Sequence, residues 1–334
     1  MALAPARVLK ALYAVLLTGT LAAPAAPAPA EPPPPSRPAS RPVSRPSAGP
    51  SAGSGPAAPV AAGTPRAPGV RGLEIAVPAY VPADGPVLSA LTATGPAASV
   101  VVLNPGNGDA PFDSSWRARA DALRRGTTAT GERPQVLGYV HTDHGDRDPA
   151  AVRASVDNYL RTPDGRLHVD GIFFDVVSRE CGPGNATRDH YAALRRYVQD
   201  TMHSVDPDVP GLVVDNPGTA TADCYLEPGH RTADVFVTYE GAYADYTSGG
   251  WPGGNVFDPA GSYRPGTELD PSGTAFWHLV HDVPDDTAMR TTLATAFARG
   301  AGYAYATGAA MPNPWDTAPT WGFQPETGYA ATLG

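Results

Sequence analysis

Short apolar runs recur along residues 71–334, and most of them lack strict alternation between polar and apolar positions. Continuous apolar runs of this length are typical of parallel strands that are buried on both faces. They predict eight strands, at residues 74–80, 99–104, 135–141, 169–176, 211–216, 234–240, 276–281 and 302–307.

Helical patterns lie between several of these runs. Residues 150–161, 187–205 and 285–299 are amphipathic, and the first of these stretches follows Asp148 and Pro149, an N-cap residue with proline at the first helical position. This strand–helix alternation predicts an α/β protein with a single (β/α)8 TIM-type barrel over residues 71–334. A doubly wound open sheet is the alternative, although no predicted strand leads into a GxGxxG or P-loop motif.

The N-terminal region predicts export. Arg7 and Lys10 precede a short apolar run at residues 11–22, and small-residue sites follow, so residues 1–30 are expected to be a signal peptide. An uncleaved membrane anchor is the alternative. Residues 31–70 are rich in Pro, Ala, Ser and Gly and predict a disordered linker. Residues 21–70 hold 15 of the 39 prolines, so the proline excess belongs mainly to this region.

Charge excludes several partners. The chain has 24 basic and 33 acidic residues, of which six basic residues and one acidic residue precede position 71, leaving 18 and 32 for the remainder. A domain as acidic as residues 71–334 is a poor partner for nucleic acid or an anionic membrane. Composition also excludes a collagen, a coiled coil and a multispan membrane protein. We expect a secreted, extracellular monomer with no membrane contact after signal cleavage.

Cys181 and Cys224 are the only cysteines. A secreted chain with two cysteines most simply forms one disulfide, here between the loops after the fourth and fifth strands. Two buried free thiols are the alternative.

Polar residues end the predicted strands, which is where a (β/α)8 barrel carries its chemistry. Asp175 and Glu240 each follow an apolar run, and two carboxylates at the rim of one barrel indicate a functional site. Each carboxylate could instead only cap the next loop.

Other polar and aromatic residues predict saccharide contacts at the same rim. Asn-Pro-Gly follows both the second and the fifth strand, and the two asparagines could either shape turns or bind sugar hydroxyls. The predicted substrate-binding residues are Tyr80, Asn104, Tyr139, His141, Asn216, Tyr243 and Trp277. Tyr239 and Trp251 are further stacking candidates, although most aromatic residues in a barrel serve packing.

A metal hydrolase is a competing hypothesis. His141, Asp143 and His144 form an H-x-D-H cluster at the end of a strand, but the cluster lacks the wider spacing of known zinc motifs. We therefore predict no metal and no cofactor.

An ordered series of short motifs carries a family resemblance over residues 75–246. The motifs are VPAY at 77–80, VLNPG at 102–106, VLGYVHT at 136–142, VDGIFFD at 169–175, VVDNPGT at 213–219 and YE at 239–240. This series resembles the spherulation-specific family 4 (spherulin-4) proteins, which are similar to glycoside hydrolase family 135 and more distantly to family 114.

The resemblance implies a secreted or surface (β/α)8 enzyme that cleaves α-1,4-linked galactosamine or N-acetylgalactosamine in an exopolysaccharide. It also implies that Asp175 and Glu240 occupy the catalytic positions. Glycoside cleavage needs an acid and a nucleophile or stabilising carboxylate, and we predict Asp175 as nucleophile and Glu240 as general acid/base, with the reverse assignment left open. One departure is clear, because the family often has Asp-Glu at the end of the fourth strand and Val176 stands here in place of the second acid. A carbohydrate-binding barrel without turnover and a spore- or wall-associated structural protein are therefore alternative functions.

Overall fold

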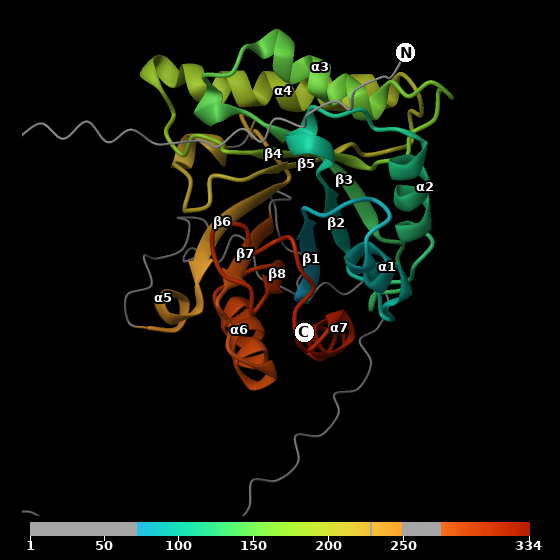
Figure 1. Ribbon diagram of the computed structural model, residues 1–334. Coiled ribbons are helices and arrows are strands. Elements are labelled where there is room, and N and C mark those ends of the chain that lie inside the picture. The colour runs from blue at the N-terminus through green and yellow to red at the C-terminus, as the bar shows by residue number, and fades with distance from the viewer. Residues whose placement is uncertain (1–71, 228, 249–274) are drawn as a thin grey trace, which may run out of the picture. The chain divides into compact units, whose positions relative to one another are not determined.

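The computed structural model describes residues 72–227, 229–248 and 275–334 (Figure 1). The predicted signal peptide (1–30), the predicted linker (31–70) and Trp251 lie outside these ranges. Within the described residues, eight parallel strands pair in chain order and close into a barrel, with β8 paired to β1. This confirms the (β/α)8 prediction. No helix in the described ranges is long and apolar enough to cross a bilayer.

The strands begin and end close to the predicted positions. They are β1 (Glu74–Ala79), β2 (Val100–Leu103), β3 (Gln135–His141), β4 (Gly171–Asp175), β5 (Leu212–Asp215), β6 (Val235–Ala242), β7 (Ala275–His281) and β8 (Tyr303–Ala306). The main difference is β6, which runs two residues past the predicted end at Glu240 because it stays paired with β7 as far as Ala242.

Helices surround the barrel (Figure 1). They are α1 (Pro86–Ala93), α2 (Ser114–Leu123), α3 (Pro149–Leu160), α4 (Ala186–His203), α5 (Tyr243–Thr247), α6 (Asp286–Ala298) and α7 (Phe323–Ala330). The predicted start of α3 is confirmed, since the Asp148 carboxylate accepts the backbone N–H of Ala150 at 3.1 Å and Pro149 is the first helical residue.

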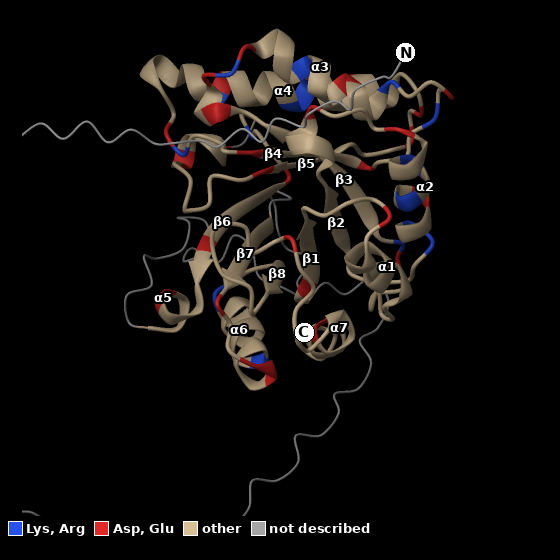
Figure 2. Cartoon of the chain, in the orientation of Figure 1, with Lys and Arg blue, Asp and Glu red and all other residues tan. Residues whose placement is uncertain are grey.

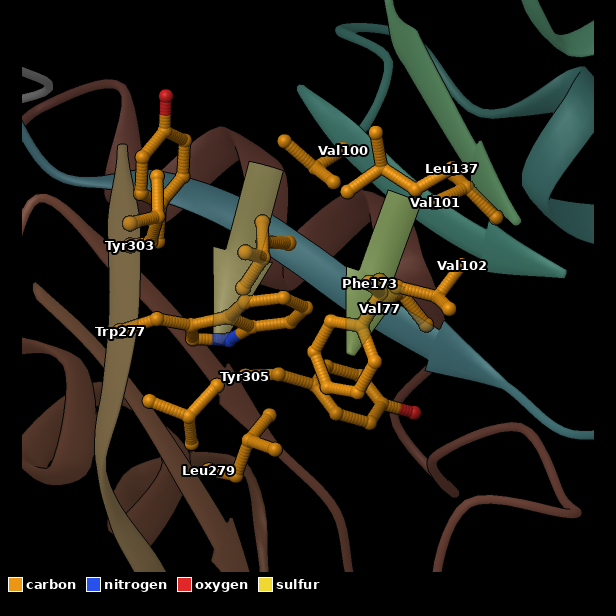
Figure 3. Packing of buried hydrophobic residues seen from close by; sticks show 14 of the residues in the cluster. Val77, Val100, Val101, Val102, Leu137, Phe173, Trp277, Leu279, Tyr303 and Tyr305 are labelled. Atoms are coloured by element: carbon orange, nitrogen blue, oxygen red, sulfur yellow. The ribbon is translucent and has the colours of Figure 1, made fainter. Parts of the chain in front are cut away.

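Aromatic side chains fill the barrel interior (Figure 3). Phe173 packs edge-to-face against Trp277 at 5.6 Å between ring centroids and lies 6.3 Å from the ring of Tyr139. Burying each such ring contributes roughly 1.5–3 kcal/mol. The strands themselves carry few charged residues, in contrast to the helices and loops (Figure 2).

Strand pairing decides which side chains reach the mouth. Side chains alternate along a strand, and directly paired residues of parallel strands point to the same side. Phe173 points inward, so Asp175, two residues further on, also faces inward at the C-terminal rim. His141 pairs with Asp175 and therefore shares that side.

A β-bulge in β6 places Glu240. Val237 pairs with Trp277, but Tyr239 pairs with His278 and Glu240 with Leu279, so one residue, Thr238, is inserted into the register. Trp277 and Leu279 point inward (Figure 3), and Glu240 therefore points inward as well. Without the extra residue, Glu240 would face the helical layer.

Candidate active site

Asp175 and Glu240 meet at the mouth of the barrel through one amide group. The Nδ2 atom of Asn216 lies 2.7 Å from Oδ1 of Asp175 and 2.9 Å from Oε2 of Glu240. Asn216 directly follows β5, so neighbouring strands β4, β5 and β6 each supply one member of this group. Both carboxylates accept an N–H from the same nitrogen.

The orientation of the Asn216 amide is set by the turn that follows it. Its Oδ1 accepts the backbone N–H of Gly218 at 2.8 Å, which leaves the NH₂ group to face the carboxylates. Gly218 has a φ of 67° and its carbonyl accepts the backbone N–H of Glu240 at 2.9 Å. The second Asn-Pro-Gly sequence is thus a turn that also aligns β6.

The shared nitrogen limits how far apart the two acids can be. The bonded oxygens of Asp175 and Glu240 can be no farther apart than the two contacts laid end to end, 2.7 Å plus 2.9 Å, or about 5.6 Å. Retaining glycosidases hold their carboxyl groups about 5–5.5 Å apart, whereas inverting enzymes need about 6.5–9.5 Å. This upper limit on one pair of oxygens is compatible with the retaining class.

Trp315 contacts Glu240 from the opposite side. Its indole Nε1–H donates to Oε1 of Glu240 at 3.1 Å, so each oxygen of this carboxylate accepts one hydrogen bond. Trp315 lies in the loop between β8 and α7 and is 5% exposed. The sequence analysis did not identify it. Its position in the loop that follows the C-terminal end of β8 is the sequence feature that could have identified it as a site residue.

Burial perturbs both acids, but their surroundings differ. Burial raises the pKa of Asp175, while hydrogen bonds from the Tyr139 side chain, the Val176 backbone and Asn216 oppose the shift. Burial also raises the pKa of Glu240, and the negative charge of Asp175 raises it further. Hydrogen bonds from Asn216 and Trp315 oppose the shift at Glu240. The charge of Asp175 disfavours ionisation of both acids at once, which suits a pair made of one acid and one nucleophile.

The chain reverses immediately after Asp175. Val176 has a φ of 53°, a left-handed conformation that is costly for a β-branched residue, by about 1–3 kcal/mol. Its carbonyl accepts the backbone N–H of His144 and, at 2.9 Å, the hydroxyl of Thr142. Thr142 is fully buried and also bonds to the hydroxyl of Tyr191 at 2.9 Å. Residue 176 is outside β4, so strand alternation does not place its side chain.

Three predicted ligand-binding residues lie near the acids. Tyr80 directly follows β1, and its ring packs edge-to-face on Tyr139 at 5.2 Å. Burial and the charge of Asp175 raise the pKa of both tyrosines, so their hydroxyls stay protonated and can donate hydrogen bonds. His141 ends β3 beside Asp175, and its positive charge would lower the pKa of that acid.

Four further candidates for ligand binding are Trp277, Tyr239, Tyr243 and Asn104, and their side chains lie in surroundings different from those of the three residues near the acids. Trp277 is 1% exposed in the barrel interior, so its side chain serves packing rather than presenting a face at the mouth. Tyr239 faces the helical layer, where its ring lies 4.7 Å from that of Tyr246. Tyr243 begins α5 and is partly buried against the core. Asn104 follows β2, and its Oδ1 is buried without a hydrogen-bond partner.

Asn216 could either shape a turn or bind sugar hydroxyls, and the structure shows the turn. Its oxygen accepts the N–H of Gly218, and its NH₂ group is engaged by both carboxylates. The structure therefore makes it a residue that positions the acids.

The H-x-D-H cluster does not assemble a ligand set. Across the described ranges, no three His, Cys, Asp or Glu side chains converge so that they could hold a metal ion. Asp143 and His144 instead form a tight turn, with φ values of 50° and 54°. His144 contributes its backbone N–H to Val176.

The predicted disulfide is confirmed. Cys181 and Cys224 are bonded, with a Cα–Cα distance of 6.1 Å, and they link the loops after β4 and β5. The loop after β4 follows Asp175 and the loop after β5 begins with Asn216, so the bond ties together two segments that start at the carboxylate site.

A histidine on β7 was also missed as a site residue. His281 ends β7, and its Nδ1 lies 2.7 Å from Oδ2 of Asp282. Its ring packs edge-to-face on Trp315, and a positive charge on it would lower the pKa of Glu240. Its position at the C-terminal end of β7, the strand that follows β6, is the sequence feature that could have identified it as a site residue.

An eight-stranded parallel barrel with a buried pair of acids at its C-terminal rim defines a class of protein whose chemistry lies in the loops that follow the strands. A family model places this chain within that class. The model for spherulation-specific family 4 matches residues 74–324, and the chain therefore belongs to that family.

The chain is similar to several solved structures. A crystal structure of Aspergillus clavatus Sph3 in complex with GalNAc is similar, with a TM-score of 0.59 and 22% identity over 79% of this chain and 98% of that one. A family 39 glycoside hydrolase from Bacteroides cellulosilyticus WH2 gives a TM-score of 0.43 and 12% identity over 79% of this chain and 64% of that one. No curated protein sequence matches significantly.

Proposed function

We propose that the protein is a retaining glycoside hydrolase that acts on an amino-sugar polysaccharide. The observation that carries the proposal is the contact of Asp175 and Glu240 with one amide nitrogen, which keeps their bonded oxygens within about 5.6 Å. Such a close approach of two carboxylates suits a covalent intermediate on one acid, whereas an inverting enzyme keeps its acids farther apart to make room for a water molecule.

The different surroundings of the acids support their roles. Asp175 attacks the anomeric carbon, while Glu240 gives its proton to the departing glycosidic oxygen. A water molecule then attacks the same carbon, Glu240 takes the proton from that water, and the bond to Asp175 breaks. The proposed roles require Asp175 to be ionised and Glu240 to be protonated when the substrate binds. Three hydrogen-bond donors at Asp175 and the repulsion of Asp175 on a charged Glu240 both favour that distribution.

We propose α-1,4-linked galactosamine or N-acetylgalactosamine as the substrate unit. Membership of spherulation-specific family 4 supports this proposal, as does the GalNAc bound to the structurally similar Sph3. The excess of acidic residues over residues 71–334 would also suit a deacetylated, cationic amino sugar. Tyr80 and His141, beside the acids, are the proposed sugar contacts.

A carbohydrate-binding barrel without turnover is a second candidate. The observation that favours it is Val176, which stands where the family often has a second acid. Saccharide binding with no product release would select this function.

We further propose that the protein is exported and works as a monomer outside the cell. The apolar segment at residues 11–22 and the Pro/Ala-rich segment after it support export, and residence at a cell wall fits the same segments.

The direct test is to incubate the protein with α-1,4-galactosaminoglycans of graded acetylation and to identify products by mass spectrometry. Shortened oligosaccharides that depend on both Asp175 and Glu240 would support the proposal. Intact polymer that is nevertheless bound would select the non-catalytic function.

A further inference from the structure

Glu240 has a hydrogen-bond partner that comes from a distant part of the chain. Trp315 lies 75 residues after it, and its indole N–H is 3.1 Å from Oε1. At 5% exposure, the indole is too buried to serve as an open stacking surface for a sugar. Its contact with the carboxylate is therefore the feature that requires explanation.

The indole of Trp315 is held in place by several elements. Its backbone carbonyl accepts the N–H of Tyr80, at the end of β1, at 3.1 Å. Its ring lies 5.9 Å from that of Tyr305 on β8 and 6.3 Å from that of His281 on β7. Because the strands fix both the backbone and the ring, the N–H has a defined direction toward Glu240.

We propose that Trp315 is a positioning residue for the acid/base of the reaction, fixing the Glu240 carboxylate and favouring its ionised form. The role of Trp315 in the reaction rests on the proposed function. Its effect on the ionisation of Glu240 rests only on the contact between the indole N–H and the carboxylate.

The chemistry of the two donors supports the proposal. An indole N–H and an amide NH₂ can only donate, so neither Trp315 nor Nδ2 of Asn216 can accept the proton of a protonated Glu240. Both bind the carboxylate more strongly than the acid, because hydrogen bonds to charged acceptors are the stronger ones. A proton on Glu240 must therefore be directed toward Asp175 or toward a bound ligand.

Other charged and titratable groups also act on Glu240. The negative charge of Asp175 raises its pKa, and a positive charge on His281 would lower it. The hydroxyls of Tyr80 and Tyr139 also sense the charge of Glu240, and both remain protonated. A test must therefore isolate the effect of Trp315 from the effects of these groups.

The first test does not require turnover. The full-length protein, labelled with ¹⁵N at its tryptophan indoles, is titrated by NMR, and the Trp315 resonance is assigned with Trp315→Phe. We expect this resonance to shift upfield as pH falls and Glu240 takes up a proton. The shift should be lost in Glu240→Gln and kept in Asp282→Asn. A Trp315 signal that does not respond to pH, or that titrates unchanged in Glu240→Gln, would overturn the proposal.

The second test uses activity. Trp315→Phe keeps an aromatic ring but removes the N–H, and we expect kcat to fall about 10-fold with little change in KM. The alkaline limb of the pH–rate profile should move to higher pH. Trp116→Phe on α2 is the matched control and should retain full activity.

Equal loss of kcat at every pH, with no movement of the limb, would show a merely structural role and overturn the proposal. If the wild-type protein releases no product from any saccharide, the proposed function fails, while the NMR titration still decides the electrostatic part. If Trp315→Phe does not fold, comparing wild-type and Glu240→Gln spectra still identifies the indole that responds to Glu240.

Discussion

The backbone N–H of Gly218 donates to Oδ1 of Asn216 at 2.8 Å, and this bond decides the chemistry of the site. With its oxygen engaged, the amide must present its two N–H groups to the carboxylates. The Asn-Pro-Gly turn after β5 therefore orients the group that holds the two carboxylates and does more than connect two elements.

The first prediction concerns that amide. Asn216→Asp keeps the shape of the side chain but places a third carboxylate oxygen between two acids, and we expect kcat/KM to fall about 100-fold or more. Asn107→Asp is the control, since Asn107 is exposed and its φ of 61° also suits Asp. Steady-state kinetics check the result. Similar activity in both variants would mean that Asn216 does not hold the acids.

The second prediction is a shifted pH profile. The proposed mechanism requires Asp175 to be ionised and Glu240 to be protonated, so kcat/KM should be bell-shaped, with Glu240 setting the alkaline limb. Burial and Asp175 raise the pKa of Glu240, and the limb should therefore lie above the ordinary range of a glutamic acid. Rates measured from about pH 3 to about pH 9 check this, and Glu240→Gln should remove the limb. A limb that persists in that variant would assign it to another group.

The sequence predicted the strands well because parallel strands buried on both faces read as apolar runs. Residues 171–174 are an example, because Gly-Ile-Phe-Phe is a short apolar run of the kind that parallel strands bury. Asp175 follows it as the first polar residue at the rim. The inward direction of Glu240 could not be derived in the same way. It depends on the bulge at Thr238, which arises from pairing with β7 and leaves no local signature.

Trp315 was missed for a similar reason. Its contact with Glu240 joins a loop to a strand that is far away in sequence, and the two meet only because the barrel closes. Trp277, in contrast, was predicted to contact the substrate but is buried inside the barrel. An aromatic residue was expected at the mouth, but it lies one layer below, at the level of Phe173, where it fills the interior.

The third prediction concerns stability. Replacing both Cys181 and Cys224 by Ser releases a loop with a sequence separation of 43 residues, and the free energy of unfolding should fall by about 4 kcal/mol in the chain-entropy model. Urea denaturation checks the loss. Reductant should destabilise the wild-type protein but leave the double variant unchanged. A reductant effect of equal size in the variant would contradict this account.

The fourth prediction is a pH-dependent stability that is independent of the active site. Glu326 on α7 is fully buried, its Oε1 accepts the N–H of Ala306 at 2.7 Å, and burial raises its pKa to about 8 from an ordinary 4.5. The folded state therefore holds a proton that the unfolded state releases. The contribution of Glu326 is full below about pH 4.5 and is lost as pH rises toward about 8.

Glu326→Gln should flatten this decline, so that the variant gains stability relative to wild type as pH rises. Melting temperatures across the same pH range check the sign. Burial also raises the pKa of Asp215 to about 8, so the melting temperature of Glu326→Gln should still fall somewhat as pH rises. Adding Asp215→Asn should remove that remaining pH dependence. A slope that is unchanged in the double variant would contradict the assignment.

The most direct test of the central claim is the anomeric configuration of the first product, followed by ¹H NMR as an oligosaccharide substrate is cleaved. The spacing of Asp175 and Glu240 predicts that the new reducing end has the same configuration as the bond that was cleaved. Asp175→Asn and Glu240→Gln should each lower the rate by at least about 100-fold, and the two losses should not add. A first product of inverted configuration, or near-full activity in either variant, would contradict the account.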